Sequence, residues 1–126
     1  MKTSFLGLRT VVYHVGDLQK AKEWYSKVFE LEPYFDEPFY VGFNIGGYEL
    51  GLLPEENPTT DKATSVVAYW GVDHINETYD RLLGLGAIAV EKPTNVGGDL
   101  MVATVKDPWG NNLGIIYNPA FKLEED

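Results

Sequence analysis

The sequence predicts an α+β fold of two βαβββ repeats, whose strands form a curved mixed sheet around a concave pocket. An apolar run followed by an Asp and an amphipathic stretch occurs twice, with the Asp at Asp17 and at Asp73. The phrases "ELGLLP" (49–54) and "NLGIIYN" (112–118) also align, so the repetition extends to single residues. The 126 residues, 44% of them hydrophobic, suit one cored domain spanning 1–126.

The first repeat is predicted at about residues 4–54. Residues 5–15 are rich in β-branched and aromatic side chains and favour a strand. Asp17 then offers a side-chain cap to a helix whose apolar residues recur at helical spacing. Residues 39–45 and 48–53 predict two strands, and Gly46-Gly47 between them is typical of a hairpin.

The polar stretch 55–62 contains a proline and is the predicted linker, after which the second repeat covers about 63–119. Residues 64–72 favour a strand, and Asp73 is the expected cap of a second helix that stops near Gly84 and Gly86. Three more strands are predicted, with the turn "DPWGNN" before the last of them: 87–93, 99–107 and 111–118. A polar C-terminal tail follows.

Charge and composition restrict the partners. A net charge of -9, with 10 basic against 19 acidic residues, argues against nucleic acid and anionic membranes. The absence of cysteine excludes disulfides and thiolate zinc sites. No apolar run approaches the roughly 20 residues that span a bilayer, and the opening residues do not resemble a signal peptide. We therefore expect a cytoplasmic protein.

Two phrases carry a family resemblance. "VGDLQKAKEWYSKVFEL" and "DPWGNNL" resemble the opening and closing motifs of the vicinal oxygen chelate superfamily, which includes glyoxalase I, bleomycin-resistance proteins and extradiol dioxygenases. The resemblance covers nearly the whole chain and implies the glyoxalase/bleomycin-resistance-like fold. It also implies a homodimer, and a metal site whose ligands come from both repeats.

Carried over by the motifs, the family's metal-ligand positions fall on Thr10, Gly51, Val67 and Gly114. Neither Gly nor Val offers a nitrogen or oxygen side-chain ligand, so we predict no metal and no other cofactor. A shift in register would bring in Glu49, and a divalent metal is expected only in that case.

Strand alternation predicts which residues line the concave face. The two glycines should leave volume there for a ligand, so that Gly51→Leu or Gly114→Leu would block binding and spare the fold. His14 and Glu49 are the candidate catalytic groups, although a histidine satisfied at a strand end and a solvated carboxylate are the alternatives. The predicted ligand-binding residues are Thr10, Val12, His14, Phe39, Phe43, Glu49, Gly51, Val67, Tyr69, Asn112 and Gly114.

Three functions remain open at this stage. The favoured one is a metal-free protein that binds a small molecule, such as a cationic aromatic compound or an antibiotic, because an acidic protein with an aromatic-lined hollow suits a planar cation. The alternative is a diverged lyase or dioxygenase-type enzyme with an altered metal site. The third is a structural or regulatory dimer.

Overall fold

The computed structural model describes residues 3–63 and 65–121. The chain divides into two compact units, one ending at Pro58 and the other beginning at Thr59, so the boundary lies inside the predicted linker. Each unit contains one helix and one four-stranded mixed sheet with the same strand connectivity. The predicted α+β fold of two βαβββ repeats is therefore confirmed. The predicted C-terminal tail lies mostly outside the described residues.

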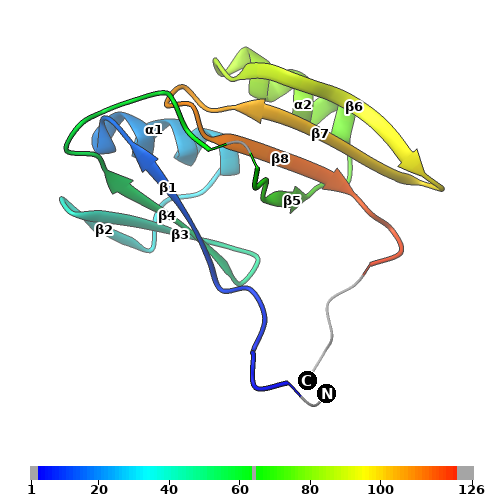
Figure 1. Cartoon of the computed structure of the whole chain (residues 1–126), viewed down its shortest axis with the longest axis horizontal. Coiled ribbons are helices and arrows are strands. Elements are labelled where there is room, and N and C mark those ends of the chain that lie inside the picture. Colours follow the sequence, from blue (N-terminus) through cyan, green and yellow to red (C-terminus); the bar gives the residue numbers. More distant parts are fainter. Residues whose placement is uncertain (1–2, 64, 122–126) are drawn as a thin grey trace. The chain divides into compact units, whose positions relative to one another are not determined.

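The first unit has a sheet in the order β1-β4-β3-β2 (Figure 1). Strand β1 runs parallel to β4, and the pairs β4–β3 and β3–β2 are antiparallel. Its five elements are β1 (Thr10–Val15), α1 (Leu18–Phe29), β2 (Phe35–Glu37), β3 (Tyr40–Ile45) and β4 (Tyr48–Pro54).

Helix α1 covers one face of this sheet. It begins as predicted, because the Asp17 side chain accepts a hydrogen bond from the Lys20 amide at 3.0 Å. The ring centroids of Tyr25, from the helix, and Tyr13, from β1, lie 6.0 Å apart. Burial of this interface forms the unit's core, to which the sheet contributes Tyr13, Val15, Val41, Phe43, Leu50 and Leu52.

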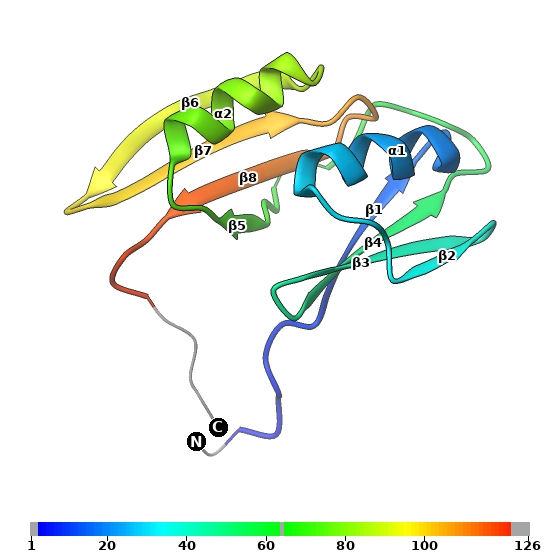
Figure 2. The same ribbon diagram turned by 180° about the vertical axis from the view of Figure 1, so that it is seen from behind.

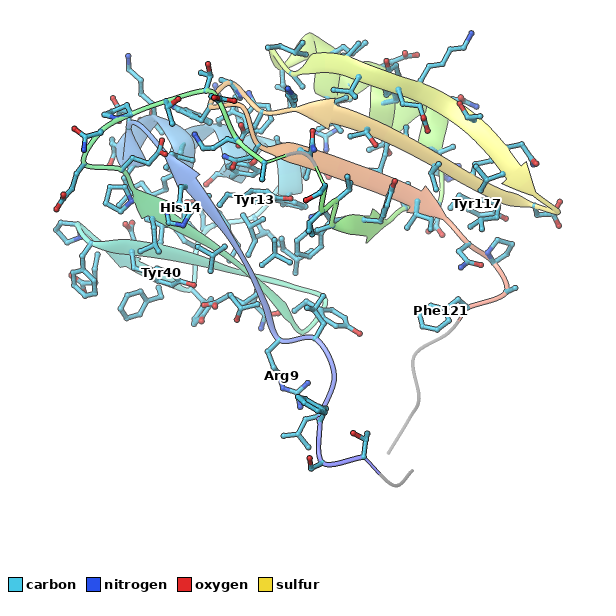
Figure 3. All side chains as sticks on the ribbon, in the orientation of Figure 1. Arg9, Tyr13, His14, Tyr40, Tyr117 and Phe121 are labelled. Atoms are coloured by element: carbon cyan, nitrogen blue, oxygen red, sulfur yellow. The ribbon has the colours of Figure 1, made fainter. Side chains whose placement is uncertain are left out.

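Strand β1 is shorter than predicted and begins at Thr10 rather than near residue 5. The reason is its partner: β4 starts at Tyr48, after the Gly46-Gly47 turn, and the last backbone bond at this end joins the Glu49 amide to the Arg9 carbonyl. Gly7, at a positive φ of 98°, also interrupts the extended backbone. Figure 3 shows Arg9 on the segment that leads into the strand.

The second unit repeats the arrangement in the order β5-β8-β7-β6. Helix α2 lies along β6 and β7 (Figure 2). The sheet's core side includes Ala103, Val105, Leu113 and Ile115. The five elements are β5 (Tyr69–Gly71), α2 (Ile75–Gly84), β6 (Ile88–Gly97), β7 (Leu100–Lys106) and β8 (Asn112–Tyr117).

The predicted cap of α2 is wrong. Its N-cap residue is His74, which makes no side-chain capping bond, and the helix starts at Ile75. The strand registers explain the error: Val12 pairs with Gly51 as Tyr69 pairs with Gly114. Asp17 follows Val12 by five residues, and the residue that follows Tyr69 by five is His74. Asp73 lies one position too early to be the counterpart of Asp17.

Two strands of the second unit also differ from their predicted lengths. Strand β5 covers only Tyr69–Gly71 of the predicted 64–72, of which residue 64 lies outside the described part of the chain. Strand β6 instead continues past Pro93 to Gly97, with irregular register against β7. A proline is tolerated there because β6 is an edge strand, on which one row of backbone amides needs no partner.

The "DPWGNN" turn between β7 and β8 is organised by a buried carboxylate. Asp107 is 0% exposed. Its Oδ1 accepts from the backbone amides of Trp109 at 2.9 Å and Asn111 at 2.8 Å, and its Oδ2 accepts from the Asn111 side-chain amide at 3.0 Å. The motif therefore stabilises the last hairpin of the second unit.

No helix in the described ranges is long and apolar enough to cross a membrane.

Candidate ligand-binding face

Within the described part of the first unit, no helix covers the face of the first sheet opposite α1, and we call this face the open face. Thr10, Val12 and His14 alternate along β1 with the buried Tyr13 and Val15, and all three are exposed. The predicted alternation of β1 is therefore confirmed. The neighbouring strand β4 places Glu49 and Gly51 on the same face, since Thr10 pairs with Glu49 and Val12 with Gly51.

Two glycines form the floor of this open face. Gly42 of β3 and Gly51 of β4 are directly opposite each other in the antiparallel ladder. A Cβ atom at Gly51 would overlap the Tyr40 hydroxyl and lie 2.6 Å from Tyr40 Cζ. A Cβ atom at Gly42 would lie 2.7 Å from Glu49 Oε2 and 3.1 Å from Tyr34 Cε1. The paired glycines thus allow the three larger side chains to lie flat on the sheet.

Three hydroxyl groups surround one carboxylate on this floor, and we call Thr10, Tyr34, Tyr40 and Glu49 the Glu49 cluster. Glu49 Oε1 accepts from the Thr10 hydroxyl at 2.9 Å and from the Tyr40 hydroxyl at 2.8 Å. Glu49 Oε2 accepts a short hydrogen bond from the Tyr34 hydroxyl. Such bonds to an ionised acceptor are stronger than those between neutral groups.

The hydrogen bonds fix the charge of the cluster. Burial on its own raises the pKa of Glu49, but the bonds from Tyr34, Tyr40 and Thr10 outweigh it and hold that pKa below its usual 4.5. Burial and the bond to Glu49 raise the pKa of Tyr40 to about 12, and the bond to Glu49 raises the pKa of Tyr34. At neutral pH the cluster therefore carries one negative charge and two neutral phenols.

The raised pKa of Tyr40 can be observed by absorbance titration of tyrosinate. We expect one tyrosine to ionise near pH 12 rather than at the usual tyrosine pKa of 10.0. Any contribution of the neutral Tyr40 to the free energy of unfolding is therefore fully present below pH 10.0 and is lost as the pH rises to about 12. In Glu49→Gln this midpoint should fall but stay above 10.0, because burial, the largest cause of the shift, remains. Glu23→Gln, on α1, should leave the curve unchanged; identical curves for wild type and Glu49→Gln would contradict the assignment.

Aromatic side chains border the Glu49 cluster. Phe35 lies 6.1 Å from Phe39 and 6.0 Å from Tyr40 between ring centroids, both in non-parallel geometry. Phe39 is 64% exposed and Tyr34 63% exposed. We call Phe35, Phe39 and Tyr40 the aromatic cluster. Exposed rings beside an ionised carboxylate are suited to hold a flat cationic molecule.

The prediction that Phe43 lines the site is wrong. The two-residue turn at Gly46-Gly47 sets Ile45 opposite Tyr48 and therefore Phe43 opposite Leu50, on the face covered by α1, where both are fully buried. Phe39, by contrast, lies outside the strands in the turn before β3, and it packs against Phe35 on the exposed side.

The space beside Gly51 is not left for a ligand as predicted, because the Tyr40 side chain occupies it. Figure 3 labels Tyr40 and His14, the latter on β1. His14 is exposed on the open face, but it pairs with Leu53, whereas Thr10 pairs with Glu49. His14 lies four positions after Thr10 on β1, roughly 13 Å along the strand, so the strand register does not place the two candidate catalytic residues, His14 and Glu49, side by side.

The remaining predicted residues lie in the second unit. Tyr69 is 44% exposed and covers Gly114, where a Cβ atom would lie 2.7 Å from Tyr69 Cδ1, and 2.8 Å from both Val67 Cγ1 and the Ala68 carbonyl oxygen. Asn112 is partly exposed and shares the side of β8 with Gly114. Gly114 is therefore also filled by a neighbouring aromatic ring. That these residues and the Glu49 cluster share one pocket stays a prediction.

The residues of the implied metal site do not fit a divalent cation. In the β1–β4 ladder Glu49 rather than Gly51 is paired with Thr10, and the Thr10 hydroxyl donates to the Glu49 carboxylate. However, three hydroxyl donors take all but one of the acceptor positions of the Glu49 carboxylate. Within the described ranges, no three His, Cys, Asp or Glu side chains gather in a metal-binding arrangement. The donor set is therefore one hydrogen-bonded carboxylate, which is a poor cation ligand on its own.

Sequence reasoning missed Tyr34, Tyr40 and Gly42 as site residues. The hairpin register could have identified Gly42, because counting back from Gly46-Gly47 puts Gly42 opposite Gly51 and Tyr40 on the same face. Tyr34 gave no such signal. It precedes β2, and its backbone amide donates to the Gly42 carbonyl at 2.9 Å, a contact that joins distant parts of the unit.

Comparison with known proteins agrees with this architecture. Residues 7–115 match the family model described as the Glyoxalase/Bleomycin resistance protein/Dioxygenase superfamily. A glyoxalase-related enzyme from Fulvimarina pelagi is 20% identical, with a TM-score of 0.77 over 97% of this chain and 95% of that one. A comparison with curated proteins finds no match.

The fosfomycin resistance protein FosX from Listeria monocytogenes, in complex with Mn(II) and sulfate, is 17% identical, with a TM-score of 0.73 over 94% of this chain and 93% of that one. A glyoxalase/bleomycin resistance protein from Albidiferax ferrireducens is 15% identical, with a TM-score of 0.70 over 88% and 98% of the two chains. At these identities the likeness concerns the fold.

Proposed function

Because the chain belongs to the glyoxalase/bleomycin resistance protein/dioxygenase superfamily, we propose that it is a metal-free protein that binds a planar cationic small molecule on the open face of its first sheet. The observation that carries the proposal is the ionised Glu49 carboxylate next to exposed aromatic rings. An antibiotic with a flat, positively charged group is a ligand of this class.

Charge and surface chemistry both support a cation. The chain has a net charge of -9, which raises the local concentration of cations and repels anions. Cations are attracted to the faces of aromatic rings. The largely exposed Tyr34 side chain donates to the carboxylate, and the largely exposed Phe39 packs against Phe35, which is in turn beside Tyr40. The site therefore offers a ring surface for the flat part of a ligand and a negative charge for its cationic group.

The test is calorimetric titration with proflavine, a planar aromatic cation. We expect binding by the wild-type protein and at least about tenfold weaker binding by Glu49→Gln, since a hydrogen bond to a charged group contributes about 1.5 to 3 kcal/mol. Glu23→Gln removes the same charge from α1, on the other side of the sheet, and should bind like the wild type. Equal affinity in all three proteins would exclude this face as the site.

Metal analysis of protein purified without chelator checks the other half of the proposal. We expect no stoichiometric zinc, nickel, iron or manganese. A stoichiometric metal would contradict the metal-free proposal and favour the lyase or dioxygenase-type alternative.

We also propose that the chain forms a homodimer. Strand β6 is an edge of the second sheet, extends over ten residues and exposes Ile88, Val90 and Val96. Edge strands offer unpaired backbone groups to another chain. Sedimentation should detect a species of twice 14.1 kDa, and Val90→Lys should shift it toward the monomer. A 14.1 kDa species alone at micromolar concentration would contradict the proposal.

The cytoplasmic location of the protein, expected from the sequence, stays a prediction.

A further inference from the structure

The Glu49 cluster presents only hydrogen-bond acceptors to a ligand. Each of the three hydroxyls has a single hydrogen. Thr10 and Tyr40 donate theirs to Glu49 Oε1, and Tyr34 donates its own to Glu49 Oε2. No hydroxyl hydrogen of the cluster therefore remains to point at a bound molecule, and what remains outward is the lone pairs of oxygen atoms.

The two carboxylate oxygens are not equivalent. Among residues 3–63 and 65–121, Oε1 accepts two hydrogen bonds, which is the usual capacity of a carboxylate oxygen, whereas Oε2 accepts one, from Tyr34. Oε2 thus keeps one acceptor position, next to a tyrosine that is mostly exposed. Since the carboxylate is charged, a donor from a cation would be bound there most strongly.

From this count we infer that the ligand's cationic group carries N–H donors, as an amidinium, guanidinium or protonated amine does, and that it is attached to a flat aromatic part. The inference rests on the proposed function and narrows its ligand class. An N–H of the cation would donate to Glu49 Oε2 while the flat part lies against the exposed rings of the aromatic cluster.

The same count disfavours two other classes. Phosphonates, sulfates and carboxylates are negatively charged and would be repelled by the Glu49 carboxylate. The cluster has no hydroxyl hydrogen left to donate to their oxygen atoms, so no hydrogen bond would offset this repulsion. A quaternary ammonium would be attracted by the rings, but it has no N–H to offer to Oε2. The donor requirement therefore predicts different affinities for two cations of equal charge, one with N–H donors and one without.

Four benzene derivatives of similar size test the inference. Benzamidinium is a cation with N–H donors, phenyltrimethylammonium is a cation without them, benzamide is a neutral donor, and benzoate is an anion. In a heteronuclear NMR titration that follows the Gly42 and Gly51 amides, we expect benzamidinium to bind at least tenfold more tightly than each of the other three. Benzoate should cause no saturable shift.

Glu49→Gln provides the matched variant, because glutamine has nearly the same shape but no charge and donates from its amide. The preference for benzamidinium over benzamide should fall to within about twofold in Glu49→Gln and persist in Glu23→Gln. Equal binding of the two cations would overturn the donor requirement and leave the proposed cation-binding function standing. Binding of neither cation, or tighter binding of benzoate, would overturn both.

Discussion

Replacing Asp107 by alanine is expected to lower the free energy of unfolding by about 3 kcal/mol or more. The Asp107 carboxylate is completely buried and accepts three hydrogen bonds, two from backbone amides and one from the Asn111 side chain. Alanine removes the acceptor of these three bonds in a largely buried setting, and each such loss costs about 1 to 3 kcal/mol before relaxation. The turn that joins β7 to β8 would lose its internal support.

Chemical denaturation followed by circular dichroism measures this loss. Asp99→Ala is the control, because Asp99 is exposed in the β6–β7 turn and its removal should change stability by less than about 0.5 kcal/mol. A loss for Asp107→Ala no larger than that of the control would show that the buried carboxylate does not stabilise the turn.

Replacing Gly114 by leucine should destabilise the second unit by about 3 kcal/mol, contrary to the expectation from sequence that the fold survives. A Cβ atom at this position would lie 2.8 Å from the Ala68 carbonyl oxygen, to which the Gly114 amide donates at 3.0 Å. Backbone cannot move aside as a side chain can, so β5 would have to separate from β8. Overpacking of this kind typically costs about 1 to 3 kcal/mol.

Gly71→Leu is the matched control, since Gly71 lies in the same strand pair but, apart from its chain neighbours, no atom of the described residues lies within 4 Å of the point where a Cβ atom would be. Leucine suits a strand better than glycine, so this variant should keep or slightly raise the melting temperature. If Gly114→Leu melts like Gly71→Leu, the close approach of β5 to β8 is not a constraint on the fold.

Gly51→Leu should behave differently from Gly114→Leu, because its closest neighbours are side-chain atoms of Tyr40. Tyr40 can rotate away at small cost to the fold, and this would break its bond to Glu49. Gly51 and Gly114 occupy equivalent positions in the two repeats. The neighbours of Gly51 are atoms of the Tyr40 side chain, whereas Gly114 is also close to the Ala68 carbonyl oxygen of the backbone.

Local sequence signals predicted the repeated βαβββ plan because each depends on neighbouring residues. Asp17 caps α1 through a contact within one helical turn, and Gly46-Gly47 adopts the positive φ angles of 60° and 93° that a two-residue hairpin needs. The alternation of β1 followed from the geometry of an extended chain. Among the predictions that failed, those at Asp73, Phe43 and the first residues of β1 each depended on where a partner strand begins or how it is aligned.

By itself, the sequence determined the fold class, the two helices and the placement of Thr10, Val12 and Glu49 on one face, because strand and helix periodicity are properties of the chain. Only the tertiary structure decided that Tyr34 and Tyr40 donate to Glu49 and that Gly42 lies beside Gly51. These contacts depend on the β2–β3–β4 registers, which are set by pairing between segments and by the room that two glycines leave. Whether a carboxylate is open to a metal or surrounded by hydroxyls is therefore decided by packing rather than by the residue type.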